Sequence, residues 1–236
     1  MCGRYRLTAK QRFIAEHFDI EESEVHASPR YNIAPTQPVP VIRQHPEEPR
    51  RDLSLMRWGF IPPQAKDSSL AASMINARSE TLASLPAFRE AFQLRRCIVP
   101  ADGFYEWQRS GSTRQPFCFV VNDGELFAFA GLWSGWRGPD GLWIKSFTIL
   151  TTTPNAVTST VHDRMPVILD KNDYDLWLDP GMKNTSAVAG LLKPFDARRV
   201  QCYPVSSRIN HVQNDDIDCS APVVLEPPPQ RQLFGS

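Results

Sequence analysis

The second residue of the chain combines two nucleophiles. The sequence begins Met1-Cys2-Gly3, and because Cys2 is small, we expect Met1 to be removed, which leaves Cys2 with a free α-amino group. This amine titrates near ~7.7–8.0 and a thiol near ~8.5, so both are partly nucleophilic at neutral pH. The amine of such a 1,2-aminothiol condenses with an aldehyde to an imine, and the thiol then adds to the same carbon and closes a five-membered thiazolidine.

Two other interpretations of Cys2 start from the same residues. In one, the thiol attacks an amide with the α-amine as base, as in N-terminal-nucleophile amidohydrolases or peptidases. Glutamine amidotransferases of that kind also begin Met-Cys-Gly, but they usually continue with an apolar residue instead of Arg4, and they use an Asn-Gly motif that this chain lacks. In the other, the protein binds single-stranded DNA without catalysis and Cys2 is incidental.

Two polar segments interrupt otherwise apolar stretches. In residues 74–80, Asn76 both donates and accepts hydrogen bonds, and Arg78 is able to grip a phosphate with two N–H groups. In residues 161–166, His162 titrates near neutrality and is suited to shuttling protons, with Asp163 beside it. A solvated Arg–Glu pair and a structural histidine are the alternatives. No HExxH or similar spacing accompanies His162, so we expect no metal and no cofactor.

A third segment sets a carboxylate among aromatic residues. Strand alternation in residues 101–107 puts Phe104 and Glu106 on one face and Tyr105 and Trp107 on the other. A carboxylate in such surroundings loses water, which raises its pKa and suits it to proton transfer. A glutamate of an edge strand that faces water is the alternative.

The elements that position these residues are mostly strands. The pattern predicts strands over 39–43, 53–58, 97–99, 104–107, 117–121, 127–132, 147–151 and 200–205, with a tight turn at 122–124. Helices are expected after a Thr8 cap (with Phe13, Ile14 and Phe18 on one face), over 86–92, after an Asp170 cap, and over 185–192. We therefore predict an α+β fold: a single domain with a mostly antiparallel, barrel-like β-sheet and peripheral helices.

Composition excludes several classes of protein. The 236 residues carry 26 basic and 26 acidic side chains, so any groove for nucleic acid must be local. Five widely spaced cysteines without a CxxC pair argue against a zinc ribbon or a disulfide framework and favour a reducing, cytoplasmic compartment. The sequence has no apolar leader and no run of 18 apolar residues, so we expect neither a signal peptide nor a membrane span. We also expect a monomer.

Taken together, nine segments resemble the SOS-response-associated peptidase (SRAP) family, whose members shield abasic sites. They keep the family's order and cover about nine-tenths of the chain. The segments are MCGRY at the start, RYNIAPTQ at 30–37, RWGFIP at 57–62, INARSET at 75–81, RRCIVPADGFYEW at 95–107, QPF at 115–117, ILTTTPN at 149–155, VHDRMPVIL at 161–169 and PVSSRIN at 204–210.

The resemblance implies a function and a role for each matching residue. The protein would bind abasic sites in single-stranded DNA, crosslink to them through Cys2 after removal of Met1, and protect the lesion during replication, in the nucleoid when bound. Asn76 would hold the N-terminus and the opened sugar, Glu106 would assist proton transfer, and His162 would assist imine formation and ring opening. The implied DNA-binding residues are Arg4, Arg78, Arg164, Pro35 and Trp58.

One segment departs from the family pattern. Some relatives carry tryptophans just after the WG-x-x-P motif, where this chain has residues 63–67, PQAKD. Base stacking there would be weaker, or supplied by Phe60 or Tyr31.

The C-terminus differs in composition from the rest. We expect residues 1–221 to form the SRAP-like domain and residues 222–236 to form a flexible, Pro-rich tail. Gln230, Leu233 and Phe234 resemble the Q-x-x-L-F peptide by which bacterial proteins dock on the replication sliding clamp. The clamp is therefore a predicted partner, with chance similarity and docking of Leu233 and Phe234 on the protein's own core as the alternatives.

Overall fold

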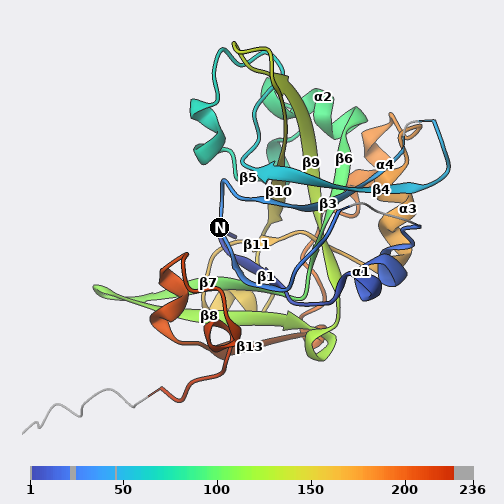
Figure 1. Cartoon of the computed structure of the whole chain (residues 1–236). Helices are drawn as coiled ribbons and strands as arrows, with labels where there is room; N and C mark the ends of the chain where they lie inside the picture. The colour runs from blue at the N-terminus through green and yellow to red at the C-terminus, as the bar shows by residue number, and fades with distance from the viewer. Residues whose placement is uncertain (1, 22–24, 46, 226–236) are drawn as a thin grey trace, which may run out of the picture.

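A computed structural model describes residues 2–21, 25–45 and 47–225 (Figure 1). It has the predicted α+β fold, in which a strand barrel and an antiparallel sheet pack around one main core. Gln230, Leu233 and Phe234 lie outside the described residues, so the clamp motif stays a prediction, as does the domain boundary at 221. In the part of the chain that the structure describes, no helix has the length and apolar character needed to cross a membrane.

The barrel is a closed ring of five strands. In ring order they are β10 (Trp143–Thr152), β4 (Arg51–Trp58), β3 (Pro38–Gln44), β6 (Arg96–Ala101) and β9 (Phe127–Arg137). Since β9 pairs with both β6 and β10, the ring has no free edge. The β4–β10 pair is parallel and the other four are antiparallel. Three short strands extend the barrel: β5 (Asn76–Arg78), β11 (Met165–Pro166) and β12 (Ile168–Leu169).

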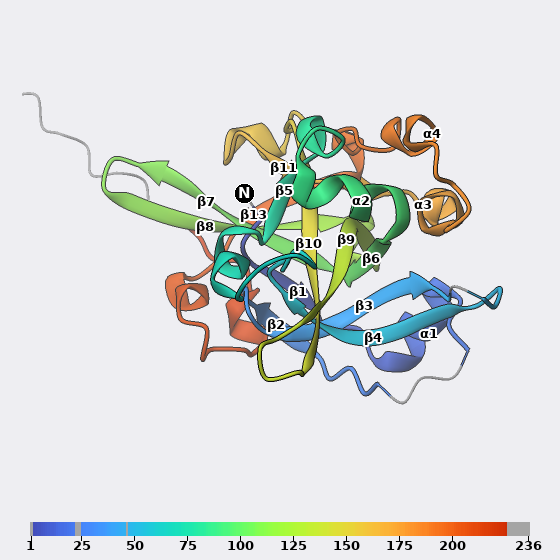
Figure 2. The same ribbon diagram turned by 90° about the horizontal axis from the view of Figure 1, so that it is seen from above.

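The second sheet holds the N-terminal strand in its interior. Its order is β13 (Val200–Pro204), β8 (Thr113–Val121), β7 (Gly103–Ser110), β1 (Tyr5–Leu7) and β2 (Arg30–Ile33). Strand β1 is thus hydrogen-bonded on both sides, to β2 and to β7. Beyond Tyr5, where β1 begins, β7 and β8 continue as a hairpin that projects from the body of the molecule (Figures 1 and 2).

Four α-helices among the described residues lie at the periphery (Figure 2). They are α1 (Gln11–Phe18), α2 (Pro86–Leu94), α3 (Tyr174–Leu178) and α4 (Thr185–Ala189). The predicted caps are wrong. Thr8 does not cap α1: its amide and hydroxyl donate to Asp102, at 2.5 and 2.8 Å, and the helix begins at Gln11. Asp170 makes no capping bond, because its carboxylate pairs with Arg199.

The alternation predicted for β7 is confirmed. Phe104 faces the main core, where its ring stacks on Phe119 with the centroids 4.9 Å apart. Tyr105 faces the opposite way, into a second small core with Cys118 and Val205. The turn at 122–124 is also present, but it carries the chain from β8 in the sheet to β9 in the barrel instead of closing a hairpin.

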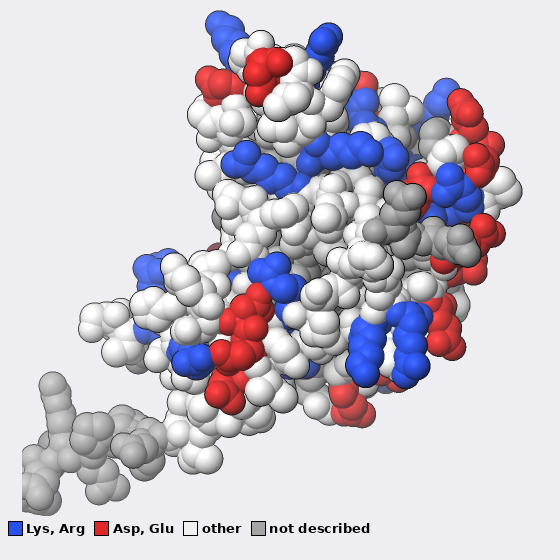
Figure 3. Space-filling view, in the orientation of Figure 1, with Lys and Arg blue, Asp and Glu red and all other residues white. Residues whose placement is uncertain are grey.

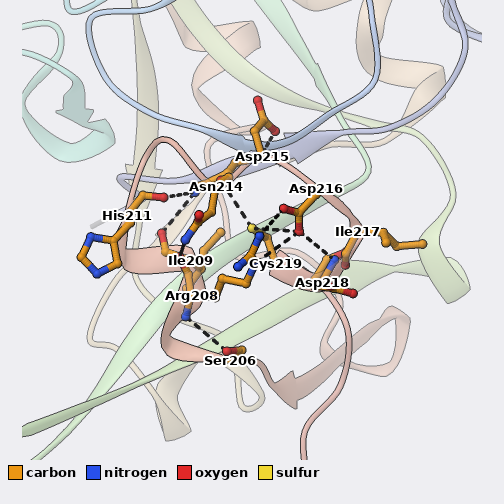
Figure 4. Close-up of polar contacts among 12 residues, drawn as sticks. Ser206, Arg208, Ile209, His211, Asn214, Asp215, Asp216, Ile217, Asp218 and Cys219 are labelled. Atoms are coloured by element: carbon orange, nitrogen blue, oxygen red, sulfur yellow. Dashed lines mark hydrogen bonds and ion pairs between the residues drawn. The ribbon is translucent and has the colours of Figure 1, made fainter.

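The segment 206–220 is fastened to β2 by the buried Asn32 side chain. The Asn32 amide nitrogen donates to the carbonyl oxygens of His211 and Asn214, at 3.0 and 2.6 Å, and its oxygen accepts from Arg4 at 2.6 Å. Asp215 adds to this by accepting from the amides of Tyr31 and Asn32. Figure 4 shows the polar contacts that residues of this segment make with one another. Its carbonyl and carboxylate oxygens converge where the Cys219 thiol donates to Asn214, at 3.4 Å (Figure 4).

We expect Asn32→Ala to destabilise the protein. The substitution removes the hydrogen bonds that the buried amide makes with Arg4 and with the carbonyls of His211 and Asn214, and a hydrogen bond to a charged group alone contributes about 1.5–3 kcal/mol. The free energy of unfolding, measured by urea titration, should fall by at least that amount. Asn172→Ala, at an exposed position, is the matched control and should change stability by less than about 0.5 kcal/mol. Equal stability of the two variants would contradict the assignment.

Candidate functional site

Cys2 is held between the barrel and the second sheet. Its side chain is completely buried in the full-length chain, and its carbonyl oxygen accepts a hydrogen bond from the Nδ2 of Asn76 at 2.8 Å. Asn76 belongs to β5, which runs parallel to β10 of the barrel and lies opposite Ile149. On the other side, the carbonyl of Arg4 accepts from the Tyr105 amide at 2.9 Å. The segment from Cys2 to Arg4 is therefore held from both sheets.

Glu106 is a buried carboxylic acid beside this terminus. Only 4% of the residue is exposed, and burial raises its pKa from 4.5 to about 7. Burial also raises the pKa of the Cys2 thiol, and the charge of Glu106 adds to the increase. Glu106 is thus close enough to affect the protonation of the Cys2 thiol. The alternative of a glutamate facing water is excluded.

His162 lies on the loop before β11. Its imidazole is about one-quarter exposed, and burial is the main cause that lowers its pKa, so the neutral ring is favoured at pH 7. Nδ1 lies 3.1 Å from the amide nitrogen of Arg164 and 2.8 Å from the carboxylate of Asp163. The neutral ring accepts from Arg164, and the protonated ring donates to Asp163. The loop therefore offers a partner to each protonation state.

One pocket brings several of the predicted residues together. It has a volume of about 490 Å³, and its lining includes Glu106, His162, Arg78 and Arg164. The prediction missed three other lining residues, Trp107, Arg109 and Arg114. A signal for them exists in the sequence: the Ser-Gly-Ser turn at 110–112 makes a hairpin that places Arg109 opposite Arg114. A second pocket, of about 710 Å³, adjoins the first and shares His162 and Arg109 with it.

The arginines of the site differ in their partners. Arg4 donates to Asn32 and, at 2.7 Å, to the carbonyl of Ile209, and Arg164 donates to both carboxylate oxygens of Glu80 at 2.6 and 2.9 Å. Both guanidinium groups therefore stabilise the protein itself in this structure. Arg78 is exposed. Phosphate binding stays a prediction for all three.

Trp58 is not available for direct contact with DNA. Its ring is completely buried, lies 5.3 Å from the Tyr5 ring, and donates from Nε1 to the Ile75 carbonyl at 2.9 Å. Its burial does not fit the direct DNA contact that the resemblance implied: Trp58 supports β1 and the residue that precedes Asn76. Phe60, named as a substitute for stacking, is also completely buried. Pro35 is half-buried after β2 and stays a predicted contact.

No group of three or more His, Cys, Asp or Glu residues suited to a metal ion occurs within residues 2–21, 25–45 and 47–225. The groups that the structure brings together at this site are the cysteine after Met1, the acid of raised pKa, the histidine and the arginines. The fold and the site together define a class of protein. In this class, a barrel and an antiparallel sheet hold the second residue of the chain beside a pocket lined by an acid, a histidine and arginines.

Comparison with known proteins identifies this class. The family model described as SOS response associated peptidase (SRAP) matches residues 1–212, and the chain belongs to this family. It is 42% identical to the abasic site processing protein YoqW of Bacillus subtilis, with 91% of this chain and 96% of that protein covered. It is 30% identical to the abasic site processing protein HMCES of Xenopus tropicalis, with 84% and 67% covered.

Solved structures agree with the fold. A protein from Bacteroides thetaiotaomicron superposes with a TM-score of 0.80 at 27% identity, covering 88% of this chain and 93% of its own. A protein from Bordetella bronchiseptica gives a TM-score of 0.73 at 31% identity, covering 87% and 100%.

The raised pKa of Glu106 predicts a pH-dependent stability. Between pH 4.5 and about 7 the folded state binds more protons at this residue than the unfolded state does. Stability is therefore full below this window and falls as the pH rises through it, by roughly 3 kcal/mol. Urea titrations of the full-length protein from pH 4.5 to 8 should show the fall, and Glu106→Gln should remove it.

The exposed Glu16 provides the control for this measurement. Glu16→Gln should keep the fall in stability that the wild type shows. A Glu106→Gln variant whose stability follows the wild type across the whole pH range would contradict the assignment of a buried acid.

Proposed function

We propose that the protein binds abasic sites in single-stranded DNA and crosslinks to them covalently through Cys2 once Met1 is removed. The observation that carries the proposal is the fixed position of Cys2, bound by Asn76 and beside an acid whose pKa lies near 7. The names of the relatives support an abasic site as the lesion that the protein binds. The chemistry of a terminal aminothiol supports an aldehyde as its target. In an abasic site, the ring-opened sugar presents that aldehyde at C1.

The proposed reaction needs one proton donor and one proton acceptor in sequence. The α-amine of Cys2 adds to C1, and protonated Glu106 gives its proton to the hydroxyl that leaves as water. The resulting iminium ion keeps one N–H proton, and its carbon, C1, accepts the sulfur as the electron pair of the C=N bond moves to nitrogen, which leaves a neutral ring amine. Glu106, now a carboxylate, takes the thiol proton. A pKa near 7 suits one group to both steps.

Because the pKa of the Cys2 thiol is raised, ring closure needs a base that removes the thiol proton. A buried Cys2 thiol stays protonated at neutral pH, and a thiolate is the effective nucleophile. A base at the site must therefore remove the proton as the ring closes. His162, which favours its neutral form, is positioned in the same pocket to assist the opening of the sugar.

Removal of Met1 is part of the same proposal. We infer that the peptidase activity in the family's name acts on the chain's own Met1, with an aminopeptidase as the other route. Protection of the lesion at replication sites is the resulting role. The sliding clamp stays a predicted partner through the tail.

The essential role of Cys2 predicts the loss of a stable adduct. Cys2→Ala should form no heat-stable adduct with an abasic oligonucleotide, because the ring cannot close without sulfur. Cys2→Ser should leave an imine that borohydride traps. Intact-mass spectrometry measures both. An undiminished adduct from Cys2→Ala would exclude this chemistry, and DNA binding that survives in Cys2→Ala is the expected control result.

The acid–base roles predict a separate effect on rates. Glu106→Gln and His162→Ala should slow formation or reversal of the adduct by about 10²–10⁴-fold, since general acid–base groups contribute that much. Binding to intact single strands should stay close to that of the wild type. Single-turnover kinetics from pH 5 to 9 measure the rates. Wild-type rates in both variants over this range would assign the two residues to structure.

A further inference from the structure

Two arginines stand opposite each other on the projecting β7–β8 hairpin. Arg109 of β7 pairs in register with Arg114 of β8, and both are exposed. Side chains directly opposite in an antiparallel pair have Cβ atoms about 4.5–5.5 Å apart, and like charges at such positions are destabilising. Two permanent cations at this spacing therefore work against the hairpin unless an anion binds between them.

Asp163 and Glu106 line the same pocket, but within the described residues no carboxylate pairs with either hairpin arginine. Neither Arg109 nor Arg114 has a hydrogen bond or an ion pair there, whereas Arg4, Arg164 and Arg208 each bind a carbonyl, an amide oxygen or a carboxylate. Arg4, Arg164 and Arg208 therefore stabilise the fold, whereas the two hairpin arginines do not. Figure 3 shows basic side chains where the hairpin leaves the body.

The pair is close to the reactive centre. Both arginines line the 490 Å³ pocket with Glu106, His162 and Arg78. Arg109 is three residues beyond Glu106 on β7, about 10 Å along the strand. Its charge also contributes to the low pKa of His162, after burial as the main cause, which agrees with this proximity. An anion bound to the hairpin would therefore extend from the lesion itself.

We propose that Arg109 and Arg114 together bind the phosphates of the DNA strand next to the abasic sugar, so that the hairpin is an arm that guides the strand away from the pocket. This inference rests on the proposed function. Phosphate fits because a guanidinium binds it bidentately and two adjacent forks match a backbone that repeats its charge. Arg78 of β5 lines the same pocket and adds a third exposed arginine to it.

The test compares a double variant with the wild type on two probes. Arg109→Gln/Arg114→Gln should bind an intact 15-nucleotide single strand at least about tenfold more weakly. The slope of log affinity against log salt should decrease by about 0.7 for each phosphate that the variant no longer binds. Free 2-deoxyribose has the aldehyde but no phosphate, so at pH 8, where His162 is neutral with or without the Arg109 charge, the double variant should form its adduct at the wild-type rate.

Two further variants serve as controls. Arg12→Gln/Arg89→Gln removes two exposed arginines of α1 and α2, which do not line the pocket, and should keep the affinity and slope of the wild type. Arg109→Lys/Arg114→Lys keeps both charges and should keep most of the slope. A hairpin double variant that matches the wild type in affinity and slope, or that binds as tightly as the α1/α2 control, would overturn the inference.

The two proposals fail in different ways. If the wild type forms no adduct with 2-deoxyribose or with an abasic strand, the crosslinking function is wrong, but the salt slopes still report on the hairpin. If the hairpin double variant reacts more slowly with 2-deoxyribose as well, the arginines act on the chemistry instead of on phosphate, which also overturns the inference.

Discussion

The pairing of β1 on both edges is the constraint on which the rest of the site depends. Chain ends ordinarily fray, yet the proposed nucleophile is the second residue and has to stay within reach of a fixed acid. Tyr5 meets this need by pairing with Ile33 of β2 and with Phe104 of β7. Asn76 adds a hold from the barrel side. The two sheets therefore hold the N-terminal segment between them, and Cys2 is positioned only when both sheets are correctly placed.

Immobilising Cys2 in this way has an electrostatic consequence. The burial that fixes the residue also raises the pKa of its thiol, which makes the thiol a poorer nucleophile at neutral pH. The same burial raises the pKa of Glu106 to about 7, where it exists in both forms. A single feature of the fold thus creates the need for a base and supplies one. Position and protonation at this site are not independent properties.

The sequence predicted the parts of the fold that depend on local pattern. Alternation placed Phe104 and Glu106 on one face and Tyr105 on the other, and the strand positions and the α2 helix followed in the same way. The caps failed because partners distant in sequence competed for them: Thr8 binds Asp102. The DNA contact implied for Trp58 does not fit its burial, because residue type does not reveal burial and only the packed barrel encloses that ring.

The arginines show why a chain with no net charge is able to present a basic pocket. Whether a guanidinium is available to a ligand depends on what lies within hydrogen-bonding distance of it, and the sequence does not record this. Arg4 and Arg164 are occupied by an amide and a carboxylate of the protein, whereas within the described residues no hydrogen bond or ion pair occupies Arg109 or Arg114 on the β7–β8 hairpin. Acidic residues elsewhere balance the total charge without neutralising that arm. The local field at the pocket is therefore set by the geometry of the hairpin and not by composition.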